Sequence, residues 1–80
     1  MVRRAPRSEY LVAFGRSVRA QREKLDLSQE ELGFRSDLDR TYISGIERGV
    51  RNPTLLSMRR LAKALGVAAS GLLKAAEGRW

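Results

Sequence analysis

The strongest structural signal in this 80-residue sequence is a capping box in its first half. Ser28 stands three residues before Glu31. The Ser28 hydroxyl can therefore accept a hydrogen bond from the Glu31 backbone N–H, while the Glu31 side chain reaches back to the N–H of Ser28. Leu27 and Leu32 flank this box and can form the accompanying hydrophobic staple. The pattern predicts a short helix directly after Ser28 that ends at about 35–36.

A second helix start follows after only a few residues. Asp39 can cap a helix that begins at Arg40, and Gly49 suits the position just past the end of that helix. Asp37 falls where the turn between the two helices needs a left-handed residue, which Asp tolerates less easily than Gly. Gly33 lies where the helices cross, and its small size lets them approach. Two short capped helices joined by a tight turn are a helix-turn-helix.

Three further helices are predicted from the spacing of apolar residues. One covers about 9–25, and another lies between the cap Thr54 and the terminator Gly66. A weaker helix covers about 69–77, because Ala68 at its expected cap position cannot cap. No segment alternates with period two over strand length, so the predicted fold class is all-α, a compact bundle of about five short helices.

The apolar positions of these helices predict the core. They are Leu11, Phe14, Val18 and Leu25 in the first helix, Leu32, Leu38, Ile43 and Ile46 between the two capped helices, and Leu55, Met58, Leu61 and Leu65 in the fourth. One domain is expected over 9–77, preceded by a basic arm at 1–8 and followed by a tail at 78–80. The arm residues Arg3, Arg4 and Arg7 either contact DNA or are simply solvated.

Composition narrows the function classes. Sixteen Lys and Arg against nine Asp and Glu give a net charge of +7, which is typical of a protein that binds a polyanion. The sequence has no Cys and no His, which excludes a disulfide framework, a zinc finger and Cys or His chemistry. We expect no metal, no cofactor and no small-molecule ligand. No apolar run approaches the roughly 18 residues that cross a bilayer, so a cytoplasmic, nucleoid-associated protein with no membrane partner is expected.

The outward face of the predicted helix after Asp39 carries side chains that suit double-stranded DNA. Arginine is the commonest bidentate reader of guanine, and threonine can donate to bases or contact the thymine methyl group, so Arg40 and Thr41 are candidate base readers. Ser44 and Tyr42 suit phosphate oxygens or a base edge. Gln29 stands at a helix N-terminus, where phosphates are favoured.

At these residues the sequence resembles the Cro/repressor-type (XRE-like) helix-turn-helix domain. The resemblance covers Leu27 to Val67, and the matching stretches are 27–32, 38–49, 51–54 and 61–67. Within this family, the run 40–48 is most similar to the controller proteins of restriction–modification systems. Similar runs also occur in small repressors of prophages and mobile elements.

The resemblance implies roles for individual residues. Base contacts are implied for Arg40, Thr41, Ser44 and Arg51, and DNA backbone contacts for Gln29, Tyr42, Arg48 and Asn52. A structural ion pair between Arg22 and Glu47 is also implied, in preference to a catalytic role for Glu47. Family members bind as two-fold dimers through their last helices, which suggests Leu72 and Leu73 for a homodimer interface. Gly45 stands where many relatives carry a long base-reading side chain, so readout is expected to depend on Arg40, Thr41 and Arg51.

The leading functional prediction is a sequence-specific transcriptional regulator that binds a (pseudo)palindromic operator as a dimer and regulates its own gene. The alternative is an antitoxin-type protein-binding module whose DNA binding is secondary. An RNA-binding role is disfavoured because the chain has few aromatics for base stacking, and no pair of titratable residues has the setting of an enzyme site. Phe34 is expected in core or edge packing rather than in a partner patch. Trp80 is either a frayed end or a dimer anchor.

Overall fold

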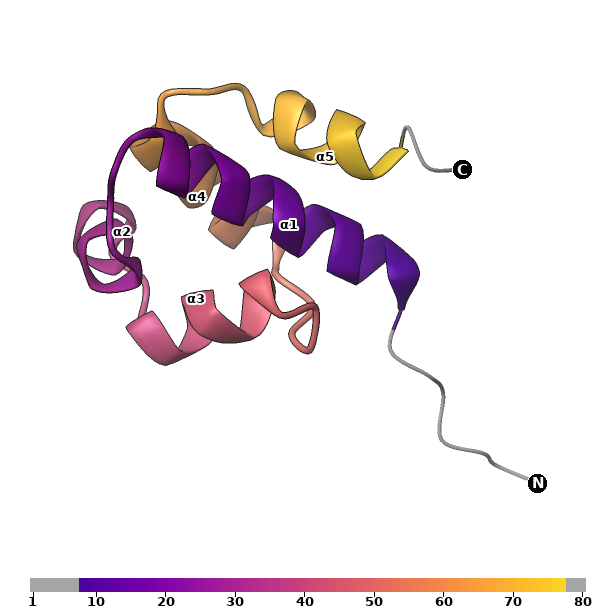
Figure 1. Ribbon diagram of the computed structural model, residues 1–80, viewed down its shortest axis with the longest axis horizontal. Coiled ribbons are helices and arrows are strands. Elements are labelled where there is room, and N and C mark those ends of the chain that lie inside the picture. The colour runs from indigo at the N-terminus through magenta and orange to yellow at the C-terminus, as the bar shows by residue number, and fades with distance from the viewer. Residues whose placement is uncertain (1–7, 78–80) are drawn as a thin grey trace.

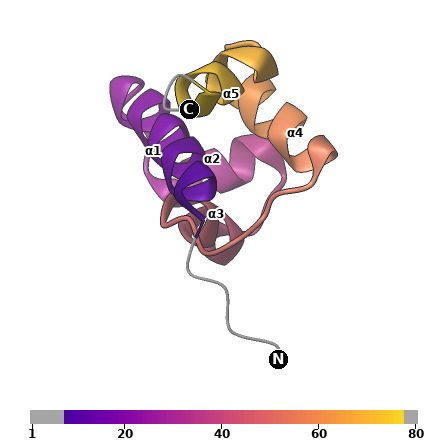
Figure 2. The same ribbon diagram turned by 90° about the vertical axis from the view of Figure 1, so that its right-hand side faces the viewer.

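The computed structural model describes residues 8–77. Its helices are α1 (Glu9–Lys24), α2 (Gln29–Ser36), α3 (Arg40–Glu47), α4 (Leu55–Leu65) and α5 (Ala69–Glu77). No strand occurs among these residues, and the all-α prediction is confirmed. Figure 1 shows α1 crossing the middle of the molecule, and in Figure 2 α3 and α5 lie at opposite ends with α1 between them. The predicted arm, except Ser8, and the tail with Trp80 lie outside the described residues.

The first four helices begin where the sequence predicts, because each of them has its N-cap. Glu31 donates its backbone N–H to Ser28 Oγ over 2.9 Å, and Ser28 donates its N–H to Glu31 Oε1 over 2.8 Å. At the start of α3, the Asp39 carboxylate accepts the backbone N–H of Thr41 over 2.7 Å. Each of these bonds satisfies an N–H that the helix itself leaves unpaired. Ser8 and Thr54 cap α1 and α4 in the same way.

Two left-handed residues close the helix-turn-helix on either side of α3. Asp37 has φ +57° at the C-terminus of α2, and Gly49 has φ +75° after α3. Gly33 lets the helices meet, since a β-carbon there would lie 2.7 Å from the carbonyl oxygen of Leu38. The predicted geometry of this turn is confirmed.

The core is formed by apolar side chains from all five helices. Its buried members are Ala13, Phe14, Val18, Leu32, Ile43, Ile46, Leu61, Ala62, Leu65, Leu72 and Ala76. The weakly predicted helix α5 is held there by Leu72 and Ala76, and at its end Tyr10 donates its hydroxyl to Glu77 over 2.6 Å. Burial of apolar side chains thus compensates for the missing cap.

Three predicted core or packing positions are wrong. Phe34 is 89% exposed, because it stands two residues after Leu32 and projects from the opposite face of α2. Leu25 is 46% exposed because α1 ends at Lys24 and the chain leaves the helical phase. Leu55 is 73% exposed, since it begins α4 at the edge of the bundle.

A close helix crossing that the sequence did not reveal joins α1 to α3. A β-carbon on Gly15 would overlap the carbonyl oxygen of Ile46 and lie 2.7 Å from that of Glu47. Gly15 therefore lets the backbones of the two helices touch. This contact places α3 against α1 with its opposite face directed outward.

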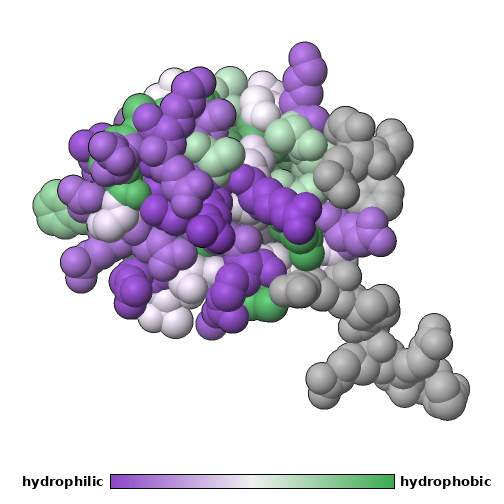
Figure 3. Space-filling view, viewed as in Figure 1, coloured by the Kyte–Doolittle hydropathy of each residue, from purple (hydrophilic) through white to green (hydrophobic). Residues whose placement is uncertain are grey.

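The surface seen in Figure 3 is covered mainly by hydrophilic side chains, with separate hydrophobic spots. None of the helices within residues 8–77 is both long and apolar enough to span a membrane. The same residues contain no group of three or more acidic side chains that could hold a metal ion.

Candidate DNA-binding interface

Helix α3 presents the candidate base-reading side chains on its outward face. Arg40 and Thr41 occupy its first turn and are exposed, while Ser44 is half-buried one turn further on. Arg48, just past the end of the helix, donates its Nε–H to the Ser44 hydroxyl over 3.4 Å. The structure therefore brings these four predicted contact residues onto one helix face.

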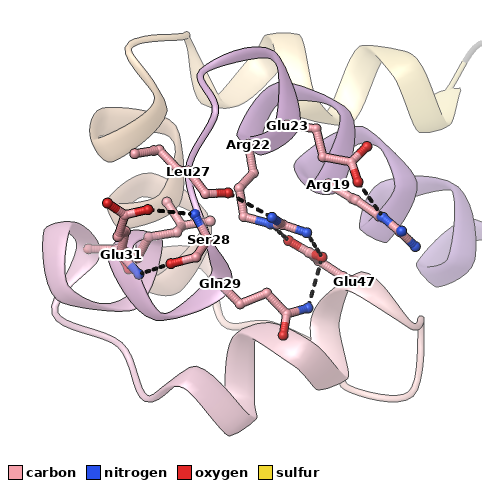
Figure 4. Close-up of polar contacts among 10 residues, drawn as sticks. Arg19, Arg22, Glu23, Leu27, Ser28, Gln29, Glu31 and Glu47 are labelled. Carbon is pink, nitrogen blue, oxygen red and sulfur yellow. Dashed lines mark hydrogen bonds and ion pairs between the residues drawn. The ribbon is translucent and has the colours of Figure 1, made fainter.

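The predicted ion pair between Arg22 and Glu47 is present at the inner side of α3 (Figure 4). Arg22 donates from Nε to Oε2 over 2.7 Å and from Nη2 to Oε1 over 3.0 Å, a bidentate arrangement. Only 12% of the Arg22 side chain and 3% of the Glu47 side chain are exposed. The hydrogen bonds to Glu47 raise the pKa of Arg22 above its ordinary value, so the guanidinium stays charged.

The same carboxylate also holds the start of α2. Gln29 donates its Nε2–H to Glu47 Oε1 over 3.0 Å, and Arg22 donates its Nη1–H to the carbonyl oxygen of Leu27 over 2.7 Å (Figure 4). Glu47 thus joins α1, α2 and α3 at one point. Gln29 has a second amide hydrogen, so its predicted phosphate contact is compatible with this bond.

Tyr42 is anchored inside the protein. Its hydroxyl donates to Ser57 Oγ over 3.2 Å and accepts the backbone N–H of Thr54 over 3.4 Å. The ring packs against the core cluster, and the hydroxyl is held at the start of α4. Because its single hydroxyl hydrogen is already used, the hydroxyl would have to leave Ser57 to donate to a phosphate.

The two predicted loop contacts lie in the segment between α3 and α4. Arg51 and Asn52 are both exposed. The guanidinium carbon of Arg51 lies 6.0 Å from the centroid of the Tyr42 ring. Asn52 lines a hollow with Pro53 and with residues of α1, α4 and α5.

The predicted dimer residue Leu72 is a core residue. Only 1% of its surface is exposed, because it faces inward from α5, and it offers a partner no side-chain area. Leu73 is half-buried and lines the same hollow as Asn52, together with Met58 of α4. The large exposed apolar side chains nearest to this region in sequence are Leu55 and Leu56, with exposed fractions of 73% and 68%. The sequence assigned Leu55 to the core and therefore missed this surface.

The fold and this surface together define a helix-turn-helix DNA-binding protein. Two short helices meet at a tight turn, the second carries arginine and hydroxyl side chains outward, and a buried ion pair fixes it to the body of the domain. The described part of the chain leaves no buried side-chain nitrogen or oxygen without a hydrogen-bond partner.

Comparison with known proteins places the chain within this class. A helix-turn-helix family model matches residues 18–72. Control protein C.BamHI of Bacillus amyloliquefaciens is 52% identical over 61 residues, covering 75% of this chain and 75% of that protein. The crystal structure of the restriction-modification controller protein C.AhdI from Aeromonas hydrophila matches with a TM-score of 0.76 and 47% identity, over 78% of this chain and 94% of that chain.

A third match was solved together with DNA. The restriction-modification controller protein C.Esp1396I, as a tetramer in complex with its natural 35 base-pair operator, matches with a TM-score of 0.79 and 35% identity. The match covers 89% of this chain and 93% of that chain. The chain belongs to the Cro/repressor-type helix-turn-helix family and is a DNA-binding transcriptional regulator.

Proposed function

We propose that this protein is a controller-type regulator that binds a (pseudo)palindromic operator as a homodimer and regulates its own transcription. The observation that carries the proposal is the first turn of α3, where Arg40 and Thr41 are exposed. The other end of α3 is fixed by the bidentate pair of Glu47. Relatives that are named control proteins support the regulatory role. The proposal includes a cytoplasmic, nucleoid-associated location and no catalytic step.

The proposed contacts divide into two groups. Arg40, Thr41, Ser44 and Arg51 contact base edges, while Gln29, Arg48, Asn52 and Tyr42 contact the DNA backbone. Base contacts determine which sequence is bound, whereas backbone contacts supply affinity and orientation. Tyr42 takes part through its ring edge or by rotating its hydroxyl away from Ser57.

The homodimer is proposed to form through the surface that includes Leu55, Leu56 and Leu73. Leu55 stands one turn before Met58, which lines the same hollow as Leu73, so this face of α4 continues toward α5. A second copy of the chain that covers this face in the dimer would explain why these leucines are exposed in the single chain. In a two-fold dimer, the two α3 helices would meet half-sites about 10–10.5 base pairs apart or a multiple of that spacing.

Sedimentation measurements can test this dimer surface. The Leu55→Ser/Leu56→Ser variant should dissociate at concentrations where the wild type is dimeric. Leu25→Ser is the matched control, because Leu25 is also an exposed leucine but lies at the C-terminal end of α1, outside the proposed surface. Equal dimer strength in all three proteins would overturn the assignment of this surface.

The test of sequence-specific binding starts from a random pool of DNA duplexes. A tightly bound duplex is selected from the pool, and its affinity is compared with that of a scrambled duplex between about 50 and 200 mM salt. We expect the selected duplex to bind about 1,000-fold more tightly or better near physiological salt. Equal affinities that collapse with salt would instead favour a protein-binding module, for which the exposed ring of Phe34 is the supporting observation.

A further inference from the structure

The loop after α3 lays the side chain of Arg51 across the middle of that helix. Gly49 turns the chain with φ +75°, and the backbone N–H of Val50 donates to the carbonyl oxygen of Gly45 over 3.0 Å. A β-carbon on Gly45 would overlap Cγ of Arg51 and lie 3.4 Å from its Nε. The aliphatic part of Arg51 therefore occupies the space that a side chain at position 45 would fill, and Gly45 is buried beneath it.

The other end of the Arg51 side chain lies near the ring of Tyr42. The distance of 6.0 Å from the guanidinium carbon to the ring centroid is at the outer limit of a cation–π contact. Tyr42 is itself held by its hydrogen bonds to Ser57 and Thr54. Arg51 is thus guided at its aliphatic part by Gly45 and at its charged end by Tyr42.

We infer that Gly45 is a positioning residue for Arg51 and sets the sequence specificity of the protein through it, without reading a base itself. The inference rests on the proposed role of Arg51 as a base reader. An exposed loop arginine loses rotamer freedom when it binds, which weakens binding. Because Gly45 has no side chain, the aliphatic part of Arg51 lies against α3 and loses less rotamer freedom on binding. Arg51 thereby becomes part of the proposed DNA-binding surface although it stands in a loop.

A double-mutant cycle in thermal stability tests this contact without DNA. The four proteins are the wild type, Gly45→Ala, Arg51→Ala and the double variant. In the Arg51→Ala background, only Cβ of residue 51 remains, 3.5 Å from the new methyl group, an ordinary contact. Gly45→Ala should therefore raise Tm in that background, because alanine is the better helix former. It should raise Tm less, or lower it, when Arg51 is present; equal shifts in both backgrounds would overturn the inference.

The same four proteins test the functional consequence on the selected and scrambled duplexes. Gly45→Ala should weaken specific binding by about 10-fold or more, the effect of a lost base contact, and leave binding to the scrambled duplex unchanged. In the Arg51→Ala background, Gly45→Ala should change specific binding by less than about 2-fold, because the side chain it displaces is already absent.

The base pairs at which specificity relaxes provide the decisive comparison. Gly45→Ala and Arg51→Ala should relax preference at the same base pairs, and Arg40→Ala at different ones. An equal further loss from Gly45→Ala in both backgrounds would show that the glycine itself meets the DNA, and would overturn the inference. If the wild type did not distinguish the two duplexes, the proposed function would fail instead, while the stability cycle would still decide the contact between Gly45 and Arg51.

Discussion

Neutralising Glu47 should cost far more stability than neutralising an exposed glutamate of the same chain. In the Glu47→Gln variant, the side chain keeps its size, but the charge that faces Arg22 is lost and an amide N–H₂ replaces one acceptor oxygen. The pair is bidentate and its side chains are only 12% and 3% exposed. Breaking a buried pair by removing one partner costs about 3–5 kcal/mol. A domain of this size has a total stability of about 4–12 kcal/mol, so the variant should lose a large share of it.

The chain supplies its own control for this experiment. Glu23 pairs with Arg19 over 3.0 Å, but these side chains are 55% and 63% exposed. An exposed pair of this spacing contributes only about 0.3–0.5 kcal/mol, so Glu23→Gln should be nearly neutral. The free energy of unfolding is measured by urea denaturation, followed by circular dichroism at 222 nm, with linear extrapolation.

Two outcomes decide the reasoning about Glu47. If Glu47→Gln and Glu23→Gln lost equal free energies of unfolding, the view that burial makes removal of Glu47 costly would be refuted. The double variant Arg22→Met/Glu47→Leu should recover most of the lost stability, since neither charge is left without its partner. A double variant as unstable as Glu47→Gln would place the cost in packing or in the lost hydrogen bonds of Gln29 and Leu27, rather than in the unpaired charge.

Three further predictions follow from particular contacts. Gly15→Ala should lower Tm because its methyl group would meet the backbone of α3, whereas Gly71→Ala, with nothing within 4 Å, should gain up to about 1 kcal/mol in urea denaturation. Arg40→Ala should weaken the binding free energy for the selected duplex by about 1–3 kcal/mol and leave that for the scrambled duplex unchanged. Arg59, at a hollow between α4 and α5, provides the control, and Arg59→Ala should leave the preference between the two duplexes unchanged. Hydrogen bonds to Ser28 lower the pKa of Glu31, so this group stabilises the folded state above its unfolded pKa, and the contribution is lost as the pH falls through its folded pKa. A carboxyl NMR titration should show Glu31 titrating below the ordinary value of a glutamate.

The helix starts were predictable because capping is a local property. Ser28 and Glu31 are three residues apart in the chain, and their two hydrogen bonds require no other part of the fold. The left-handed backbone of Asp37 was predictable for the same reason, since the turn places it between two capped helices. The pairing of Arg22 with Glu47 joins residues 25 apart in sequence, and it was expected only from family resemblance.

The burial of individual side chains was less predictable because it depends on which elements are neighbours. Apolar spacing put Leu55 in the core, but the first turn of α4 extends past the bundle edge. Family resemblance suggested Leu72 for the dimer interface, although α5 turns it fully inward. Gly15 meets the backbone of α3, and Gly45 meets the side chain of Arg51 in the loop after α3. Apolar spacing predicts neither contact.

Glu47 links α2 and α3, so that the two helices are expected to move as one rigid unit when the protein binds DNA. Its carboxylate accepts from Gln29 at the first residue of α2, while Glu47 itself ends α3. Glu47 therefore fixes the position of Gln29, with its proposed phosphate contact, relative to Arg40 and Thr41, with their proposed base contacts. A shift of one would move the other, because Arg22 of α1 holds both Glu47 and the carbonyl oxygen of Leu27, two residues before α2. A variant that restores stability with apolar residues at positions 22 and 47 would thus still leave Gln29 without its partner, and stability and DNA affinity would separate.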